Sequence, residues 1–281
     1  MMPPSLGQLM AHADALPSLP EIVHHLMSTL KDEGADVDTL AHHINADPAI
    51  VARLLAAANS SAFGVNTRID SARQAFYYLG VNRVVNIIMA TALIQRFDTR
   101  TADFDARLLW RHTMGVATCA RVLAEEIDYD PEIAFTAGLL HDIGQVLMFT
   151  AAPNDYAHVL ELRQKDDSSI LSAEIEVFGY DHTAAGSLLA REWKLPWEII
   201  EAIAAHHDPD SYNNTGSQLG DLIHLAEVLS HALDIGEQPN NRVPDLSERA
   251  CANLGVSWPT FAGRFAEIEA RYDGIRIALG I

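Results

Sequence analysis

Basic residues are scarce in this sequence. Lys and Arg together number 19 in 281 residues, against 38 Asp and Glu, so the formal net charge is −19. Nucleic acids and anionic membranes are bound by patches of Lys and Arg, so this charge argues against either as the main partner. It does not exclude a small anionic substrate, because a bound metal ion reverses the sign of the charge locally.

Cysteines and long apolar runs are also few. The two cysteines, Cys119 and Cys251, lie far apart and cannot form a disulfide framework, which is typical of a protein in a reducing cytosol. No basic segment followed by an apolar stretch marks a signal peptide at the N-terminus. The most apolar run, residues 84–94, is shorter than the ~20 residues that span a bilayer. We therefore expect a cytoplasmic protein that does not associate with membranes.

No stretch alternates apolar and polar residues as a half-buried strand does, whereas apolar residues recur at helical spacing along the chain. Several predicted helices begin with a capping residue followed by proline, as at Asp47–Pro48 and Asp130–Pro131. We predict an all-α protein. The predicted helices are 21–31, 38–44, 48–60, 71–79, 81–97, 106–127, 131–150, 156–165, 169–178, 182–194, 197–207, 218–233, 247–254 and 258–270.

The adjacent pair His141 and Asp142 lies in the middle of one of the most apolar predicted helices, 131–150. A carboxylate costs several kcal/mol to bury unless it is paired or binds a metal ion. Neighbouring residues on a helix are ~100° apart, so both side chains can converge on one ion. The alternative is a buried structural ion pair.

Other histidines and one acid lie on other predicted helices and can complete a metal site. Mixed nitrogen and oxygen ligands suit Fe, Mn, Zn, Co or Ni better than Ca, and we expect one or two ions. Two ions bridged by Asp142 would form a centre for phosphoryl hydrolysis, in which Asp142 is the catalytic residue and a bridging hydroxide the nucleophile. The candidate ligands are His112, His141, Asp142, His182, His206, His207 and Glu227.

Some of these assignments have alternatives. His206 and His207 are adjacent in a predicted helix, so one is expected to be a ligand and the other a surface or outer residue. Glu227 is as easily a solvated residue as a ligand. Seven other histidines are interpreted as surface or structural, although His224 is one turn from Glu227 and could orient it. They are His24, His25, His42, His43, His158, His224 and His231.

Longer motifs accompany these residues. The front half contains LPSLPEIV, ADPAIVARLLAAANSSAFG and IDSARQAFYYLGVNRVVNIIMATAL. The back half contains LWRHT, AFTAGLLHDIGQ, GYDHTAAGSLLAREWKLPWEIIEAIAAHH and LIHLAEVLS. In these motifs the sequence resembles the HDOD proteins, relatives of the HD-domain metal-dependent phosphohydrolases, over roughly residues 15–235. The resemblance implies a two-lobed helical fold with an HD-like helical core.

The resemblance also implies a ligand set. In catalytic HD proteins the ligands are a first His, the His-Asp dyad and a late Asp. His112, His141 and Asp142 match the first three positions, and the late acid falls on Glu227, which is longer by one methylene.

A second metal is implied by similarity to the HD-GYP enzymes, which hydrolyse cyclic di-GMP. His182, His206 and His207 fall where those enzymes have further histidines. Two positions depart from that pattern: Gln145 replaces the Lys that often follows HDIG, and Asp208-Pro209-Asp210 stands without the GYP triplet. These departures argue against cyclic di-GMP as the substrate.

We predict a front lobe in residues 1–100, an HD-like lobe in 101–235 and a C-terminal helical extension in 236–281. The first hypothesis is a signal-transduction protein whose HD-like lobe binds metal and acts on a phosphorylated or nucleotide ligand, while the front lobe contacts a signalling protein. The alternative is a non-catalytic interaction module with a vestigial site. The C-terminal helices either pack against their own chain or form a homodimer.

A third hypothesis, a general nucleotide phosphohydrolase, requires basic residues near the metal to hold phosphate. In the sequence, the nearest candidates are Arg111, Arg191 and Lys194.

Overall fold

The computed structural model describes residues 3–13, 37–65, 67–97, 104–166, 169–211, 217–236, 241–256 and 258–281. Over these ranges the regular secondary structure is helical and contains no strand element, so the all-α prediction is confirmed. The predicted helix 21–31 and the doublet His24–His25 lie outside the described residues. The helices are α1 (Leu6–Ala13), α3 (Val37–Asn45), α4 (Pro48–Ala58), α5 (Ala72–Leu79), α6 (Val81–Arg96), α7 (Ala106–Glu126), α8 (Pro131–Leu140), α9 (Ile143–Ala151), α10 (Pro153–Asp166), α11 (Ile170–Phe178), α12 (His182–Glu192), α13 (Trp197–Ala205), α14 (Gln218–Ala232), α15 (Glu248–Leu254), α16 (Trp258–Ala262) and α17 (Phe265–Leu279).

Local chemistry explains where many helices begin. The Asp47 carboxylate accepts hydrogen bonds from the backbone N–H groups of Ala49 and Ile50 at the start of α4, with Pro48 in the first turn. Asp130 and Asp181 cap α8 and α12 in the same way. These side chains satisfy N–H groups that have no partner inside the helix, which is why the capping pattern could be read from the sequence.

Two apolar cores hold the helices together. The smaller core gathers buried side chains between residues 40 and 88, from α3, α4, α5 and the first half of α6. The larger core runs from the second half of α6 to the C-terminus and also takes in Leu9 of α1. Helix α6 therefore connects the two lobes, because its first half packs in the smaller core and its second half in the larger core. Its residues 84–94 are all buried.

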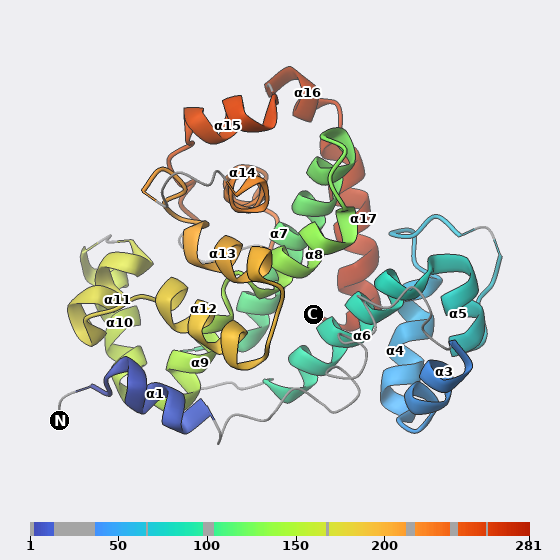
Figure 1. The fold of residues 1–281 in the computed structure, drawn as a ribbon, viewed down its shortest axis with the longest axis horizontal. Coiled ribbons are helices and arrows are strands. Elements are labelled where there is room, and N and C mark those ends of the chain that lie inside the picture. Colours follow the sequence, from blue (N-terminus) through green and yellow to red (C-terminus); the bar gives the residue numbers. More distant parts are fainter. Residues whose placement is uncertain are drawn as a thin grey trace.

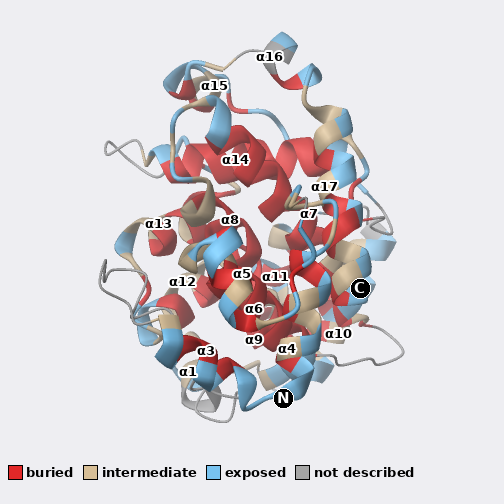
Figure 2. Ribbon diagram, turned by 90° about the vertical axis from the view of Figure 1, so that its right-hand side faces the viewer, coloured by how far each residue is buried: buried red, intermediate tan, exposed pale blue. Residues whose placement is uncertain are grey.

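The C-terminal helices pack against their own chain. Helix α15 lies on α14, and α17 packs against both α7 and α4, between the larger lobe and the α3–α5 group (Figure 1). Figure 2 shows the buried residues concentrated in the central helices, above all α14 and α7. The described helices of this extension therefore pack within the chain, and the homodimer stays a prediction.

Two predicted helices are interrupted. The helix predicted over 131–150 is broken at His141–Asp142, because Asp142 has φ −100° and ψ 12° and the chain changes direction there. The helix predicted over 258–270 is divided into α16 and α17, and α17 extends to Leu279. The continuous apolar pattern concealed the first break because both halves, α8 and α9, are buried.

One helical stretch among the described residues, Pro131–Ala151, is long and apolar enough to cross a membrane, with a mean hydropathy of 1.3. However, 83% of its apolar window is buried inside the protein. The stretch comprises α8 and α9, so its hydrophobicity is explained by the larger core.

Glycine permits a very close approach of α9 to α12. A Cβ atom on Gly144 would lie 1.9 Å from the carbonyl oxygen of His182 and 2.7 Å from the backbone nitrogen of Gly186. Both are backbone atoms, which cannot move aside to accommodate a methyl group as the end of a flexible side chain can. This contact sets the distance between the Asp142 turn, which precedes Gly144, and His182 at the start of α12.

We predict that Gly144→Ala lowers the free energy of unfolding by about 1–3 kcal/mol or more, because the added methyl forces two helices apart. Urea denaturation measures this change. Gly7→Ala in α1 is the matched control, since a Cβ atom on Gly7 would meet no other atom within 4 Å and alanine favours the helix. Equal stability of the two variants would contradict the packing argument.

Candidate metal centre

The carboxylate of Asp142 lies at the centre of a buried group of histidines and acids. Its Oδ2 atom is 3.5 Å from His141 Nε2 and 3.7 Å from His112 Nε2. Its Oδ1 atom is 3.1 Å from His182 Nε2 and 3.8 Å from His206 Nε2. The two oxygens of one carboxylate thus face two different sets of imidazoles.

The first set consists of His112 on α7, His141 at the end of α8 and Glu227 on α14. Glu227 Oε2 lies 3.1 Å from His112 Nε2 and 3.3 Å from His141 Nε2. All three residues are buried, and their ligand atoms lie within 4.8 Å of one another. The longer side chain of Glu227 therefore reaches the position that the resemblance gave to an aspartate.

The second set consists of Asp142, His182, His206 and His207, whose ligand atoms also lie within 4.8 Å of one another. His182 is the first residue of α12, and His206 and His207 follow the end of α13. The Nε2 atoms of His182 and His207 are only 3.1 Å apart. The structure thus brings together all seven residues that the sequence predicted.

The prediction that only one of His206 and His207 faces the site is wrong. Helix α13 ends at Ala205, and the two histidines lie in the bend that follows it. Their ring centroids are 4.1 Å apart. Outside a regular helix, neighbouring side chains are no longer fixed ~100° apart, so both rings can turn toward Asp142.

Hydrogen bonds on the outer side of the rings fix which nitrogen faces the site. His141 Nδ1 lies 2.7 Å from the Gly138 carbonyl oxygen, and His206 Nδ1 lies 2.8 Å from that of Ile203. A carbonyl oxygen only accepts, so Nδ1 donates in both rings and Nε2 is directed at the centre. This arrangement is typical of histidines that bind metal.

Two further residues, which the sequence did not indicate, hold ligands from outside. Glu174 Oε2 lies 2.6 Å from His182 Nδ1 and also accepts from the His182 backbone N–H. His231 Nε2 lies 3.0 Å from Glu227 Oε1. His231 is four residues after Glu227 on α14, a spacing that could have revealed it, whereas Glu174 belongs to another helix and carries no such signal.

His224, the residue expected to orient Glu227, has a different role. Its Nδ1 donates to the carbonyl oxygen of His206 at 2.8 Å, and its Nε2 accepts from the Ser247 backbone N–H at 3.1 Å. It therefore supports the backbone that carries His206. The interpretation of His42, His43 and His158 as surface residues is confirmed, since all three are exposed.

The donor set fits transition-metal ions. Several buried atoms that face the centre have no hydrogen-bond partner among the described residues, an arrangement that costs free energy unless another group binds them. Imidazole nitrogens and carboxylate oxygens in this mixture suit Fe, Mn, Zn, Co or Ni. The unpartnered atoms are His141 Nε2, Asp142 Oδ1, His206 Nε2 and Glu227 Oε2.

The electrostatics divide the histidines into two classes. Burial lowers the pKa of His141, but Asp142 and Glu227 outweigh burial and raise it to about 9. Burial also lowers the pKa of His182, but Glu174 and Asp142 outweigh this effect and raise the pKa well above its usual value. Burial and the neighbouring His182 lower the pKa of His207 to about 4. His206 is also neutral at neutral pH, since burial and His207 lower its pKa.

The acids remain ionised. Burial raises the pKa of Asp142, but His141 and His182 more than compensate and hold it well below the usual range. Burial is offset in the same way at Glu227, where His112 is the main cause of the lowered pKa. Asp142 and Glu227 are therefore available as ionised oxygen donors for a divalent ion.

A cleft of 580 Å³ leads to the centre, where it is lined by His112, Asp142, His207 and Glu227. Its outer walls come from α10, α11 and residues 242–245, and include the arginines Arg163 and Arg242. The basic residues expected near the centre were Arg111, Arg191 and Lys194. None of them lines this cleft among the described residues, and Arg191 lies instead over the ring of Trp197, 5.1 Å from its centroid.

Comparisons with known proteins agree with this geometry. An HDOD domain protein of unknown function from Geobacter sulfurreducens has the same fold, with a TM-score of 0.80 and 26% identity over 96% of this chain and 97% of that one. A candidate phosphohydrolase from Shewanella amazonensis SB2B matches with a TM-score of 0.78, 26% identity and the same coverage.

The curated relatives align with this chain over only a part of their own length. An uncharacterised protein of Treponema pallidum is 24% identical over 233 residues, which are 82% of this chain and 45% of the relative. Ribonuclease Y of Thermus thermophilus is 31% identical over 161 residues, 56% of this chain and 22% of the enzyme. This chain therefore spans less than half of these relatives. The HDOD domain family model matches residues 16–209, and the chain belongs to the HDOD family.

Proposed function

We propose that this chain binds two divalent transition-metal ions and hydrolyses a phosphate ester bond in a small anionic ligand. The observation that carries the proposal is the position of Asp142, whose two oxygens face two separate sets of ligands. A carboxylate in this position can bridge two ions. Bound ions would supply a hydroxide nucleophile at neutral pH and stabilise charge on the phosphoryl group.

The residues of the chain have distinct roles in this proposal. His112, His141 and Glu227 would hold one ion, and His182, His206 and His207 would hold the other, with Asp142 shared. Glu174 keeps the His182 ring in place through its 2.6 Å contact with Nδ1. Arg163, at the cleft wall, is available to bind the phosphate of a substrate.

The cleft supports a small substrate rather than a polymer. Its 580 Å³ lies within the range of about 300–1,000 Å³ typical of sites for small ligands. The net charge of −19 disfavours binding to a long polyanion. Ribonuclease Y, as its name says, acts on RNA, and similarity to it supports a phosphodiester as the bond that is cleaved.

Exposed aromatic residues favour a second candidate function, a protein-interaction module that signals through a partner. Tyr77 and Tyr78 on α5 are 83% and 46% exposed, and tyrosine is enriched in protein interfaces. In this hypothesis the front lobe contacts a signalling protein in the cytoplasm. The two functions are compatible, and turnover by the metal-loaded chain distinguishes an enzyme from a module that only binds.

We predict that the chain, loaded anaerobically with Fe(II) or Mn(II), holds about two ions and hydrolyses bis(4-nitrophenyl) phosphate. Asp142→Asn should lower kcat/KM by more than about 100-fold, because it removes the carboxylate that both ions share. Loss of a residue that only hydrogen-bonds a metal ligand typically costs about 10–100-fold. Elemental analysis and the colour of released nitrophenolate provide the measurements. His158→Ala, at an exposed position, is the control. A loaded chain without turnover would overturn the enzymatic proposal and leave the interaction module.

We also predict that metal binding at neutral pH releases protons. In the metal-stripped chain, His141 and His182 have raised pKa values and are protonated, whereas a metal ligand must be neutral. Affinity should therefore rise with pH through about 9, the pKa of His141, and fall as the solution becomes more acidic. Calorimetry in buffers of different ionisation enthalpy counts the protons. His141→Ala should release about one proton fewer, and a binding heat independent of buffer would contradict the prediction.

A further inference from the structure

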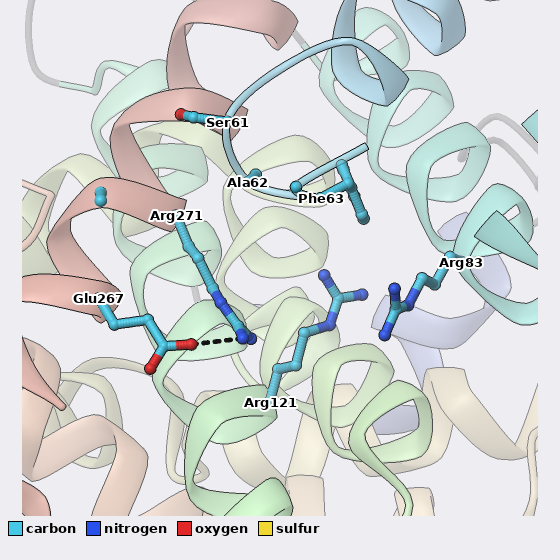
Figure 3. Close-up of a pocket in the computed structure, with 9 residues that line it drawn as sticks. Ser61, Ala62, Phe63, Arg83, Arg121, Glu267 and Arg271 are labelled. Carbon is cyan, nitrogen blue, oxygen red and sulfur yellow. Dashed lines mark ion pairs between the residues drawn. The ribbon is translucent and has the colours of Figure 1, made fainter. Parts of the chain in front are cut away.

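A second cavity, of 290 Å³, lies where the two lobes and the C-terminal helix meet. It is lined by the segment 61–64 after α4, Arg83 of α6, Arg121 of α7 and the first half of α17 (Figure 3). None of its lining residues belongs to the metal centre. The segment 61–64 is the end of the front-half motif ANSSAFG, which the metal centre does not use.

Close packing fixes one edge of this cavity. A Cβ atom on Gly274 would lie 2.8 Å from Ser61 Oγ and 2.9 Å from the Ala62 backbone nitrogen. Helix α17 therefore approaches the segment 61–64 as closely as a glycine allows. The cavity is preformed by packing, which reduces the ordering that a ligand would have to impose.

Three guanidinium groups, those of Arg83, Arg121 and Arg271, gather beneath Phe63 (Figure 3). The lining contains a single carboxylate, Glu267, which pairs with Arg271. Each additional guanidinium costs free energy by repulsion from the others. The walls thus present more positive than negative charge to the cavity.

One carboxylate outside the lining, Glu132 of α8, is shared by two of these arginines. Its Oε1 is 3.0 Å from Arg83 Nε, and its Oε2 is 2.6 Å from Arg121 Nη2. Arg271 has a further partner outside the lining, with Nη1 2.8 Å from Glu125 Oε1. These acids hold three guanidinium groups that also line the cavity.

Arg121 is the most unusual of the three. It is only 4% exposed, and its Nε atom has no hydrogen-bond partner among the described residues. Its guanidinium lies 4.0 Å from the ring centroid of Phe135 and 5.5 Å from that of Phe63, where rings supply no hydrogen-bond acceptor. Burial lowers the pKa of Arg121, Glu132 opposes this, and Arg83 and Arg271 lower the pKa further. The buried Nε–H group of Arg121 lacks an acceptor among the described residues and lies near two further guanidinium groups. A bound anion would accept this hydrogen bond and offset the repulsion between the arginines.

We propose that this cavity binds a small molecule carrying a phosphate or diphosphate group, held by Arg83, Arg121 and Arg271 beside Phe63. Phosphate oxygens are matched by several guanidinium groups because these donate charge-assisted hydrogen bonds in pairs. The volume suits a phosphate or diphosphate with a small organic part. The bound ligand would join the front lobe, the larger lobe and α17, and the inference does not depend on the metal-centre proposal.

The test uses the full chain stripped of metal, with pyrophosphate as the probe in isothermal titration calorimetry at fixed ionic strength. Arg83→Gln and Arg271→Gln should each weaken binding roughly tenfold or more, because each removes charge-assisted hydrogen bonds. Arg276→Gln is the matched control: it lies on the same helix α17, pairs with Asp273 and does not line the cavity, so it should leave affinity unchanged. Circular dichroism checks that every variant is folded.

Pyrophosphate can also bind at a metal centre, so a second titration distinguishes binding at the arginine cavity from binding at the candidate metal centre. The double variant His141→Ala/Asp142→Ala should retain full pyrophosphate affinity if the arginine cavity is the site. Loss of binding in this variant with retention in Arg83→Gln and Arg271→Gln would overturn the proposal, as would no saturable binding up to about 10 mM in the unaltered chain. Either result would leave the metal-centre proposal standing on its own tests.

Discussion

Burial of the Asp142 carboxylate is the constraint on which the rest of the structure depends. An ionised carboxyl with 4% of its residue surface exposed needs compensation. Four imidazoles lie within 3.8 Å of it, and two of them, His141 and His182, have raised pKa values and supply the positive charge. These rings come from α7, α8, α12 and the end of α13, and Glu227 of α14 closes the group. The helices of the larger lobe therefore converge on one point, and Asp142 lies there at the break between α8 and α9.

Close helix packing makes this convergence possible. Gly144 and Gly186 let α9 and α12 touch backbone to backbone, and Gly138 does the same for α8 against α7, where a Cβ atom would lie 2.7 Å from the Ala117 Cα atom. The three contacts hold the helices that carry His112, His141, Asp142 and His182. Outer partners such as Glu174 then fix the ring orientations at the centre.

The candidate metal centre and the arginine cavity are connected through one helix pair. Helix α7 carries His112 and Arg121, and α8, which leads into His141, carries Glu132 near its start. The Arg121–Glu132 ion pair therefore ties together the ends of α7 and α8 that lie away from the metal centre. The two sites therefore share helices α7 and α8.

The sequence by itself determined most of the helices, although not α1, because capping residues and apolar spacing act locally, and it also indicated the seven histidines and acids of the centre. Only the tertiary structure decided how they are used: the break at His141–Asp142, the shared orientation of His206 and His207, and the support from Glu174 and His231. It likewise decided that Arg163 and Arg242, rather than nearer arginines in the sequence, line the cleft. The reason is physical: a helix forms from contacts three or four residues apart, whereas an ion site and its cleft depend on side chains from helices whose approach is set by packing.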